Sequence, residues 1–288
     1  MAAGRRAVES PVSVHRGGTV PLHVVLILAE LIRVHSAAGA ALAVWVGAHL
    51  AGARWSVDWL LPMAVAFLLS AAGNADNDAY DAELDRLNRP GRPIPRGVVT
   101  PMQAHVVAAA AWTAALLCAF PSGLISTLGT VAALGTTVLY TRHVKRQPLI
   151  GNGLVGALAG MALGYGALLA GNVPAVLGPG VAMVTFFAGR EVLKTVYDLP
   201  GDRAFGVPTA AILWGVGPTL RIVALLWGVT GGFITWVAGG VVGSASLITL
   251  AMVLMPVVLD PTSRHAAGRS LAWSKAAGLG ALVAMLWL

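Results

Sequence analysis

Charged residues and cysteine are both scarce in this 288-residue chain. Charged side chains make up 11% of it, hydrophobic ones make up 57%, and Cys118 is the single cysteine. One cysteine excludes an intrachain disulfide bond and a cysteine-based metal site. The net charge of +7 comes without a polar domain that could present its bases to nucleic acid, so we expect no nucleic-acid partner. The mean hydropathy of +0.78 instead indicates a polytopic membrane protein embedded in a lipid bilayer.

The N-terminal segment lacks the apolar core and the adjoining cleavage site of a signal peptide. It is polar and contains Arg5, Arg6 and Arg16. We therefore expect a cytosolic tail over residues 1–18. A single transmembrane domain over residues 19–288 should follow, because no long polar linker interrupts the rest of the chain.

Long apolar windows recur along the chain. Each has about 20 residues, the length that crosses the hydrocarbon core of a bilayer. They predict an all-α membrane protein with nine transmembrane helices in one bundle. The windows are 28–52, 57–82, 101–119, 122–141, 149–171, 175–197, 209–238, 241–259 and 267–288.

Basic residues are distributed very unequally between the two sides of this predicted bundle. The tail and the loops on its side hold twelve Lys and Arg residues, whereas the opposite loops hold only Arg54. Because cytoplasmic loops are enriched in Lys and Arg, the N-terminus should lie in the cytosol, with the chain integral to the cytoplasmic membrane. The loops on the basic side are 83–100, 142–148, 198–208 and 260–266.

Acidic side chains gather where the second window ends. If the helix continues past the window, they fall on one face, at intervals of three and four residues. Neighbouring carboxylates repel one another near lipid, and a divalent cation would relieve that repulsion. Mg²⁺ is the natural candidate, because it takes oxygen ligands and bridges carboxylates to phosphates. The acidic stripe comprises Asn74, Asp78, Asp81 and Asp85, and the loop after it adds Arg86, Arg89, Arg92 and Arg96, suited to phosphate oxygens.

A second acidic segment ends the sixth window. Asp198 and Asp202 repeat the four-residue spacing, and Lys194 and Arg190 precede Asp198 by one and two turns. Two such helix ends would let two metal ions bind one diphosphate from both sides. The alternative is a hydrated helix end in which Asp198 simply pairs with Lys194.

Three other polar residues end spans on the same side. Arg33 can bind phosphate or extend to the membrane surface, and Glu30, three residues earlier, is its expected partner. Tyr140 and Lys145 end the fourth span, where they are either phosphate ligands or ordinary cytosolic-side residues.

The two acidic segments resemble the paired aspartate-rich motifs of the UbiA superfamily of intramembrane prenyltransferases. The run from Asn77 to Gly97 is similar to the first motif, and the run from Asp198 to Thr209 is similar to the second. The resemblance implies nine helices around a central cavity, with Mg²⁺ and an isoprenyl diphosphate at its cytosolic mouth. The short sequences Asn88-Arg89-Pro90 and Arg190-Glu191 are similar to those in the archaeal lipid-ether and chlorophyll-synthase branches of the superfamily.

The resemblance also implies roles for individual residues. Two positions depart from the family pattern. Thr195 stands where relatives often have an aspartate, and Val34 stands where a proline commonly follows the first arginine. The implied metal and catalytic residues are Asn77 with Asp78, Asp81, Asp85, Asp198 and Asp202. The resemblance implies that Arg33 and Lys145 bind the diphosphate. From their position beside the acids we expect the same of Arg89, Arg92, Tyr140, Arg190 and Lys194.

These inferences predict Mg²⁺-dependent transfer of an isoprenyl group, through an allylic carbocation, to an aromatic or lipid-alcohol acceptor. No Ser–His, Cys–His or Lys nucleophile is evident, so a covalent enzyme intermediate is not needed. One alternative is a terpene cyclase of the same fold that acts on the diphosphate alone. Few aromatic residues, namely Phe67, Phe186 and Phe187, lie on the spans nearest the acids, which favours transfer. The other alternative, a transporter, should carry charges at the midplane or on both sides, whereas here they gather at one.

Overall fold

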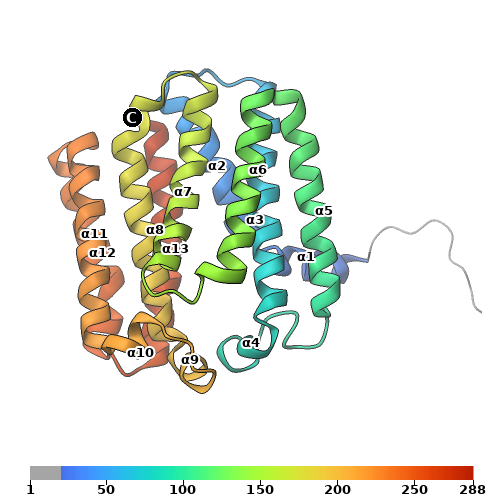
Figure 1. Ribbon diagram of the computed structural model, residues 1–288. Coiled ribbons are helices and arrows are strands. Elements are labelled where there is room, and N and C mark those ends of the chain that lie inside the picture. Colours follow the sequence, from blue (N-terminus) through green and yellow to red (C-terminus); the bar gives the residue numbers. More distant parts are fainter. Residues whose placement is uncertain (1–20, 288) are drawn as a thin grey trace, which may run out of the picture.

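The computed structural model describes residues 21–287 (Figure 1). The predicted tail over residues 1–18 lies outside this range. Within it the secondary structure is helical and contains no strand, and eight helices are long and apolar enough to cross a membrane. A ninth span results if the bent pair α1 (Leu22–Leu31) and α2 (Val34–Leu50) is counted as one. The predicted all-α bundle is confirmed.

The remaining helices follow the predicted windows closely. Figure 1 shows the long helices running side by side, while the short helices α4, α9 and α10 gather at one end of the bundle. The bounds are α3 Leu60–Tyr80, α4 Ala82–Asn88, α5 Pro101–Ala119, α6 Leu124–Leu139, α7 Ile150–Leu169, α8 Leu177–Tyr197, α9 Leu199–Ala204, α10 Ala210–Trp214, α11 Val216–Ala238, α12 Gly240–Leu259 and α13 Arg264–Ala284.

The first predicted span is not one continuous helix. It breaks between α1 and α2 with a bend of 62°. Arg33, at the break, has a left-handed backbone with φ 51° and ψ 61°, which is unfavourable for a residue with a Cβ. The carbonyl of Ile32 accepts a hydrogen bond from the Asn74 amide on α3, at 3.1 Å. The helix breaks here although Val34 stands where the family commonly has a proline. Contacts with α3, and not a proline, therefore stabilise the break.

Two further predicted continuities are interrupted. The acidic stripe was expected on one helix, but α3 ends at Tyr80 and α4 begins at Ala82, with Asp81 between them. The seventh window is divided at Gly215, whose φ of 79° separates α10 from α11. Both interruptions lie at the end of the bundle that carries the short helices.

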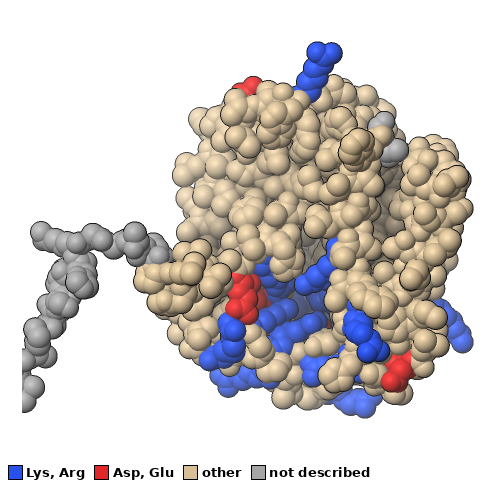
Figure 2. Space-filling model, turned by 180° about the vertical axis from the view of Figure 1, so that it is seen from behind, with Lys and Arg blue, Asp and Glu red and all other residues tan. Residues whose placement is uncertain are grey.

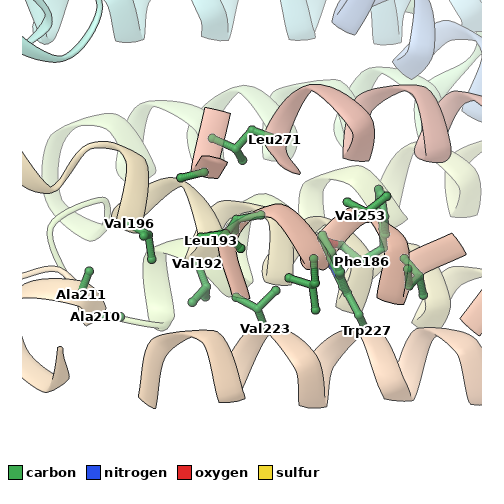
Figure 3. Packing of buried hydrophobic residues seen from close by; sticks show 14 residues of the cluster. Phe186, Val192, Leu193, Val196, Ala210, Ala211, Val223, Trp227, Val253 and Leu271 are labelled. Carbon is green, nitrogen blue, oxygen red and sulfur yellow. The ribbon is translucent and has the colours of Figure 1, made fainter. Parts of the chain in front are cut away.

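An apolar core between α8, α11, α12 and α13 holds the second acidic segment in place. Figure 3 shows this cluster, in which Phe186 and Trp227 lie against each other. Their ring centroids are 5.7 Å apart, and the Trp227 indole donates a hydrogen bond to the Phe186 carbonyl at 3.0 Å. Trp227 is fully buried, so its indole nitrogen needs such a partner. These contacts fix the register of α8 against α11.

Candidate active site

The two acidic helix ends lie beside each other, and Asn88 at the end of α4 joins them. Its amide donates to Asp202 at 3.3 Å, and its side-chain oxygen accepts from the Gly201 N–H at 3.0 Å. Asn88 is buried, and Gly201 lies so close that a Cβ there would come within 2.4 Å of the Asn88 side-chain oxygen. The predicted single mouth for both acidic segments is therefore present, at one end of the bundle.

The first group of charges is centred on Asp78, which is 3% exposed. Arg33 forms an ion pair with this carboxylate and donates to Asn74 at 3.1 Å. Arg92, from the loop after α4, lies 3.1 Å from Asp78 and also pairs with Asp85. The kink at Arg33 thus lets the guanidinium reach across to α3, and the loop after α4 folds back onto its own acidic stripe.

Glu30 does not pair with Arg33, contrary to the expectation from their three-residue spacing. It pairs with Arg96 from the loop after α4. The reason is the bend after α1, which turns the two residues onto separate helical segments. Arg86 is exposed and pairs with Glu83 at 3.3 Å instead of with the acidic stripe.

Lys145 reaches the acidic stripe from the end of α6. Residues Tyr140–Val144 form a turn of π-helix there, a feature that often marks functional sites. Lys145 forms an ion pair with Asp81 and donates to the Asn77 side-chain oxygen at 2.9 Å. The half-buried Tyr140 lies within electrostatic reach of Asp81. The structure therefore brings Lys145 into contact with the first acidic segment, and Tyr140 lies in the π-helical turn just before it.

Asp198 pairs with Arg89, not with Lys194. Arg89 comes from the loop after α4, and its guanidinium lies 2.8 Å from the Asp198 carboxylate. The same guanidinium lies over the Tyr197 ring, 4.2 Å from its centroid. The alternative pairing of Asp198 with Lys194 is thus absent, and a base from the first segment neutralises an acid of the second.

Arg190 and Lys194 both pair with Glu191 instead. The distances are 3.3 Å from Arg190 and 2.6 Å from Lys194. Glu191 is 8% exposed and had no assigned role in the sequence interpretation. Neither cation forms an ion pair with a predicted metal-binding aspartate. Thr195 is buried as well and donates to the Val192 carbonyl at 2.8 Å, so it adds no carboxylate to the second segment.

Two carboxylates of the candidate site that lie outside the membrane spans, those of Asp202 and Asp85, have raised pKa values. Burial, together with the charge of Asp198, raises the pKa of Asp202 to about 7. Burial also raises the pKa of Asp85, although the neighbouring Arg92 opposes the change. A cation that approached either carboxylate would favour its charged form.

The donor set fits a hard divalent ion by its chemistry. All of the predicted ligands offer carboxylate or amide oxygens, which Mg²⁺ prefers. Within residues 21–287, however, no three His, Cys, Asp or Glu side chains come together as a ready-made metal group. Four of the five aspartates are paired with long, flexible cationic side chains. A diphosphate that drew those cations to itself would free the carboxylates for metal, so the two ligands suit each other.

Comparison with known proteins places the chain among prenyltransferases. Residues 37–282 match the UbiA prenyltransferase family. The digeranylgeranylglyceryl phosphate synthase of Methanopyrus kandleri is 38% identical over 206 residues, which cover 68% of this chain and 72% of that one. The enzyme of the same name from Haloquadratum walsbyi is 34% identical over 218 residues, covering 73% and 76%.

Solved structures share the fold. A UbiA homolog from Aeropyrum pernix matches with a TM-score of 0.71 at 21% identity, covering 89% of this chain and 99% of that one. A UbiA homolog from Archaeoglobus fulgidus, solved with DMAPP and Mg²⁺ bound, matches with a TM-score of 0.65 at 17% identity, covering 89% and 99%. The chain is an integral-membrane prenyltransferase, and it belongs to the UbiA prenyltransferase family.

Proposed function

We propose that this enzyme transfers an isoprenyl group from an isoprenyl diphosphate to a hydroxyl group of a glyceryl phosphate lipid. The observation that carries the proposal is the joining of two aspartate-bearing helix ends at one mouth, where each segment's acids are paired with cations. The acceptor is inferred from the relatives named digeranylgeranylglyceryl phosphate synthase, whose name describes a glyceryl phosphate that carries two prenyl groups.

The side-chain oxygens of two segments would hold Mg²⁺. They belong to Asn77, Asp78, Asp81 and Asp85 on the first segment and to Asp198 and Asp202 on the second. When bound, Mg²⁺ supplies positive charge that stabilises the departing diphosphate. The remaining work falls to the protein's own cations. Arg33, Arg89, Arg92 and Lys145 now pair with the aspartates, and they are placed to donate to diphosphate oxygens instead.

The prenyl chain would lie among the apolar helices above the mouth. As the bond from carbon to the diphosphate oxygen breaks, the electron pair leaves with the diphosphate and an allylic cation remains. Apolar walls exclude water from this cation until the acceptor hydroxyl attacks it. The new carbon–oxygen bond forms as that hydroxyl loses its proton to the departing diphosphate.

The structure favours this reaction over cyclisation of the donor. A cyclase needs aromatic faces around its substrate to stabilise migrating positive charge. Phe186 is instead stacked on Trp227 in the core. Trp112 packs in the cluster beside α3 and α5, and Trp214 is exposed. Phe186 and Trp112 therefore pack between helices.

The orientation and the domain layout belong to the same proposal. We place the mouth on the cytosolic side of the cytoplasmic membrane, because the loops at this end carry most of the basic residues. Residues 19–288 would form the one catalytic domain, with residues 1–18 as a cytosolic tail. The diphosphate end of a prenyl diphosphate is a water-soluble anion, so a mouth that opens to the cytosol can receive it directly.

The test is product analysis with purified protein, Mg²⁺ and geranylgeranyl diphosphate. The acceptors would be geranylgeranylglyceryl phosphate, 4-hydroxybenzoate, or none, and products would be identified by mass. We expect a doubly prenylated glyceryl phosphate. A cyclic hydrocarbon or a terpene alcohol formed from the donor alone, at a rate unchanged by any acceptor, would mean that the enzyme is a cyclase. Prenylation of the aromatic acceptor only would replace the lipid acceptor in the proposal.

A further inference from the structure

A second group of basic side chains lies next to the aspartate-rich mouth, and within residues 21–287 it forms no ion pair with the aspartates there. It comprises His35 on α2, Arg190 on α8 and Lys275 on α13. The ammonium of Lys275 lies 3.3 Å from the Nε2 atom of His35. Helix α13 packs against both α2 and α8, and the charge of Arg190 acts on His35 and Lys275, so the three side chains from distant parts of the chain lie near one another.

This group has more positive charge than its surroundings neutralise. Within residues 21–287, Lys275 forms no ion pair with any carboxylate. Arg33, Arg89 and Lys194 lie close enough to repel it as well. The acid beside Arg190 is Glu191, which Lys194 shares, and the buried Nε atom of Arg190 has no hydrogen-bond partner. Uncompensated cations in a membrane-embedded bundle are costly, so an anion is expected among them.

The group is accessible. His35 and Lys275 are both exposed, although they lie on helices that pack against each other near the middle of the molecule. Figure 2 shows a hollow on one face of the bundle in which Lys and Arg side chains gather. Arg33 borders both regions, because it pairs with Asp78 and also acts on His35 and Lys275. A ligand beside Lys275 would therefore lie next to the donor's diphosphate.

We propose that His35, Arg190 and Lys275 bind the phosphate group of the glyceryl phosphate acceptor. The inference rests on the proposed function, and it adds where the acceptor is held. A phosphate monoester has oxygens that accept from the fork of Arg190 and from the ammonium of Lys275. The diphosphate of the donor has its own cations in Arg89, Arg92 and Lys145, each already beside an aspartate. A phosphate at Lys275 would leave the glyceryl hydroxyl, a few bonds away, facing the donor.

Equilibrium binding of radiolabelled geranylgeranylglyceryl phosphate tests this, measured in detergent with a chelator present and no donor. The wild type should bind it more tightly than geranylgeranylglycerol, which lacks the phosphate. Lys275→Gln should weaken binding of the phosphate lipid about 10- to 100-fold, the range of a charge-assisted hydrogen bond, and leave binding of the alcohol unchanged. Lys275→Arg should retain most of the affinity.

Arg269→Gln is the matched control. Arg269 is exposed on the same helix, six residues earlier and hence on a different face, and it forms no ion pair within the described range. It should bind both lipids as the wild type does. If Arg269→Gln and Lys275→Gln weaken binding of the phosphate lipid equally, the effect comes from general surface charge, and the proposal is overturned.

Other outcomes separate this inference from the proposed function. If Lys275→Gln binds normally while Arg92→Gln does not, the acceptor phosphate lies among the aspartates and the subsite is wrong, whatever the product. If phosphatidylglycerol displaces the acceptor equally well, the cations bind a bilayer lipid and the proposal fails. If Lys275-dependent binding is seen but no prenylated glyceryl phosphate forms, the proposed reaction fails while the phosphate subsite stands.

Discussion

Asn88 and Gly201 are in direct contact across 113 residues of sequence, through a hydrogen bond of 3.0 Å from the Gly201 N–H to the Asn88 side chain. The contact joins α4 to α9, and the Asn88 amide also donates to Asp202. Neither residue need touch a substrate for this contact to matter. Because it fixes the spacing of the two acidic segments, it sets the distance over which metal and diphosphate must be bound.

Substitutions at this contact should lower activity without removing any charge. Asn88→Ala leaves the Gly201 N–H without its partner, and Gly201→Ala places a Cβ 2.4 Å from the Asn88 oxygen. We expect each to reduce kcat/KM about tenfold or more, which corresponds to roughly 1.4 kcal/mol or more. The double variant removes the clash, so it should lose less than the sum of the two single losses. The measurement is steady-state kinetics at saturating Mg²⁺.

Gly91→Ala is the control for that experiment. Gly91 lies in the loop after α4 with nothing within 4 Å of an added Cβ, and its φ is not positive. Its activity should match the wild type. Strictly additive losses in the double variant would show that Asn88 and Gly201 act independently, contrary to the contact.

The second prediction concerns the metal. Activity should be lost in excess chelator and restored by Mg²⁺. Asp198→Asn should lower the rate by orders of magnitude while the melting temperature changes little, because Asp198 is partly exposed. Asp78→Asn should lower both the rate and the melting temperature, since it leaves Arg33 and Arg92 facing a buried neutral amide. Rate and thermal unfolding are measured on the same preparations.

Asp58→Asn provides the reference for both readouts. Asp58 is exposed in the short turn before α3, where it accepts a hydrogen bond from the Ser56 hydroxyl at 3.2 Å. Turnover that persists in excess chelator would rule out the metal-dependent mechanism, and a normal rate for Asp198→Asn would move that residue to a structural role.

Local periodicity predicted much of the fold and of the candidate site. Apolar windows located the spans, because burial in lipid demands about 20 apolar residues whatever the tertiary contacts are. The aspartates were found because their spacing follows the helical period. Asn88 continues that same spacing three residues after Asp85, a signal that could have identified it.

Features that depend on distant contacts could not be predicted in this way. The break at Arg33 is hidden within an apolar window, and the Asn74 side chain that supports it is 42 residues away. The partners of Arg89 and Lys275 depend equally on how the bundle closes. For this reason the sequence assigned Mg²⁺ to the acids and phosphate to the loop arginines, whereas in the structure those arginines pair with the acids themselves.

The third prediction tests the strained backbone at Arg33. Its left-handed conformation costs about 1–3 kcal/mol for a residue with a Cβ, and glycine avoids that cost. Arg33→Gly and Arg33→Ala both lose the ion pair with Asp78, so both should be poorly active. Arg33→Gly should nevertheless be more stable than Arg33→Ala, by about 1 kcal/mol in unfolding experiments. The opposite order of stability would mean that the backbone straightens when the ion pair is lost.

The last prediction concerns which way the mouth faces, and it compares three Arg→Cys variants in a Cys118→Ala background. Arg86 lies on α4 and Arg203 on α9, both exposed at the mouth, whereas Arg54 is exposed in the loop before α3. Because basic residues mark the cytosolic side, a membrane-impermeant thiol reagent should label Arg86→Cys and Arg203→Cys only from the cytosol. It should label Arg54→Cys only from outside, which controls for membrane integrity. Labelling of Arg86→Cys and Arg203→Cys from opposite sides would contradict a shared mouth, and labelling of both from outside would invert the proposed orientation.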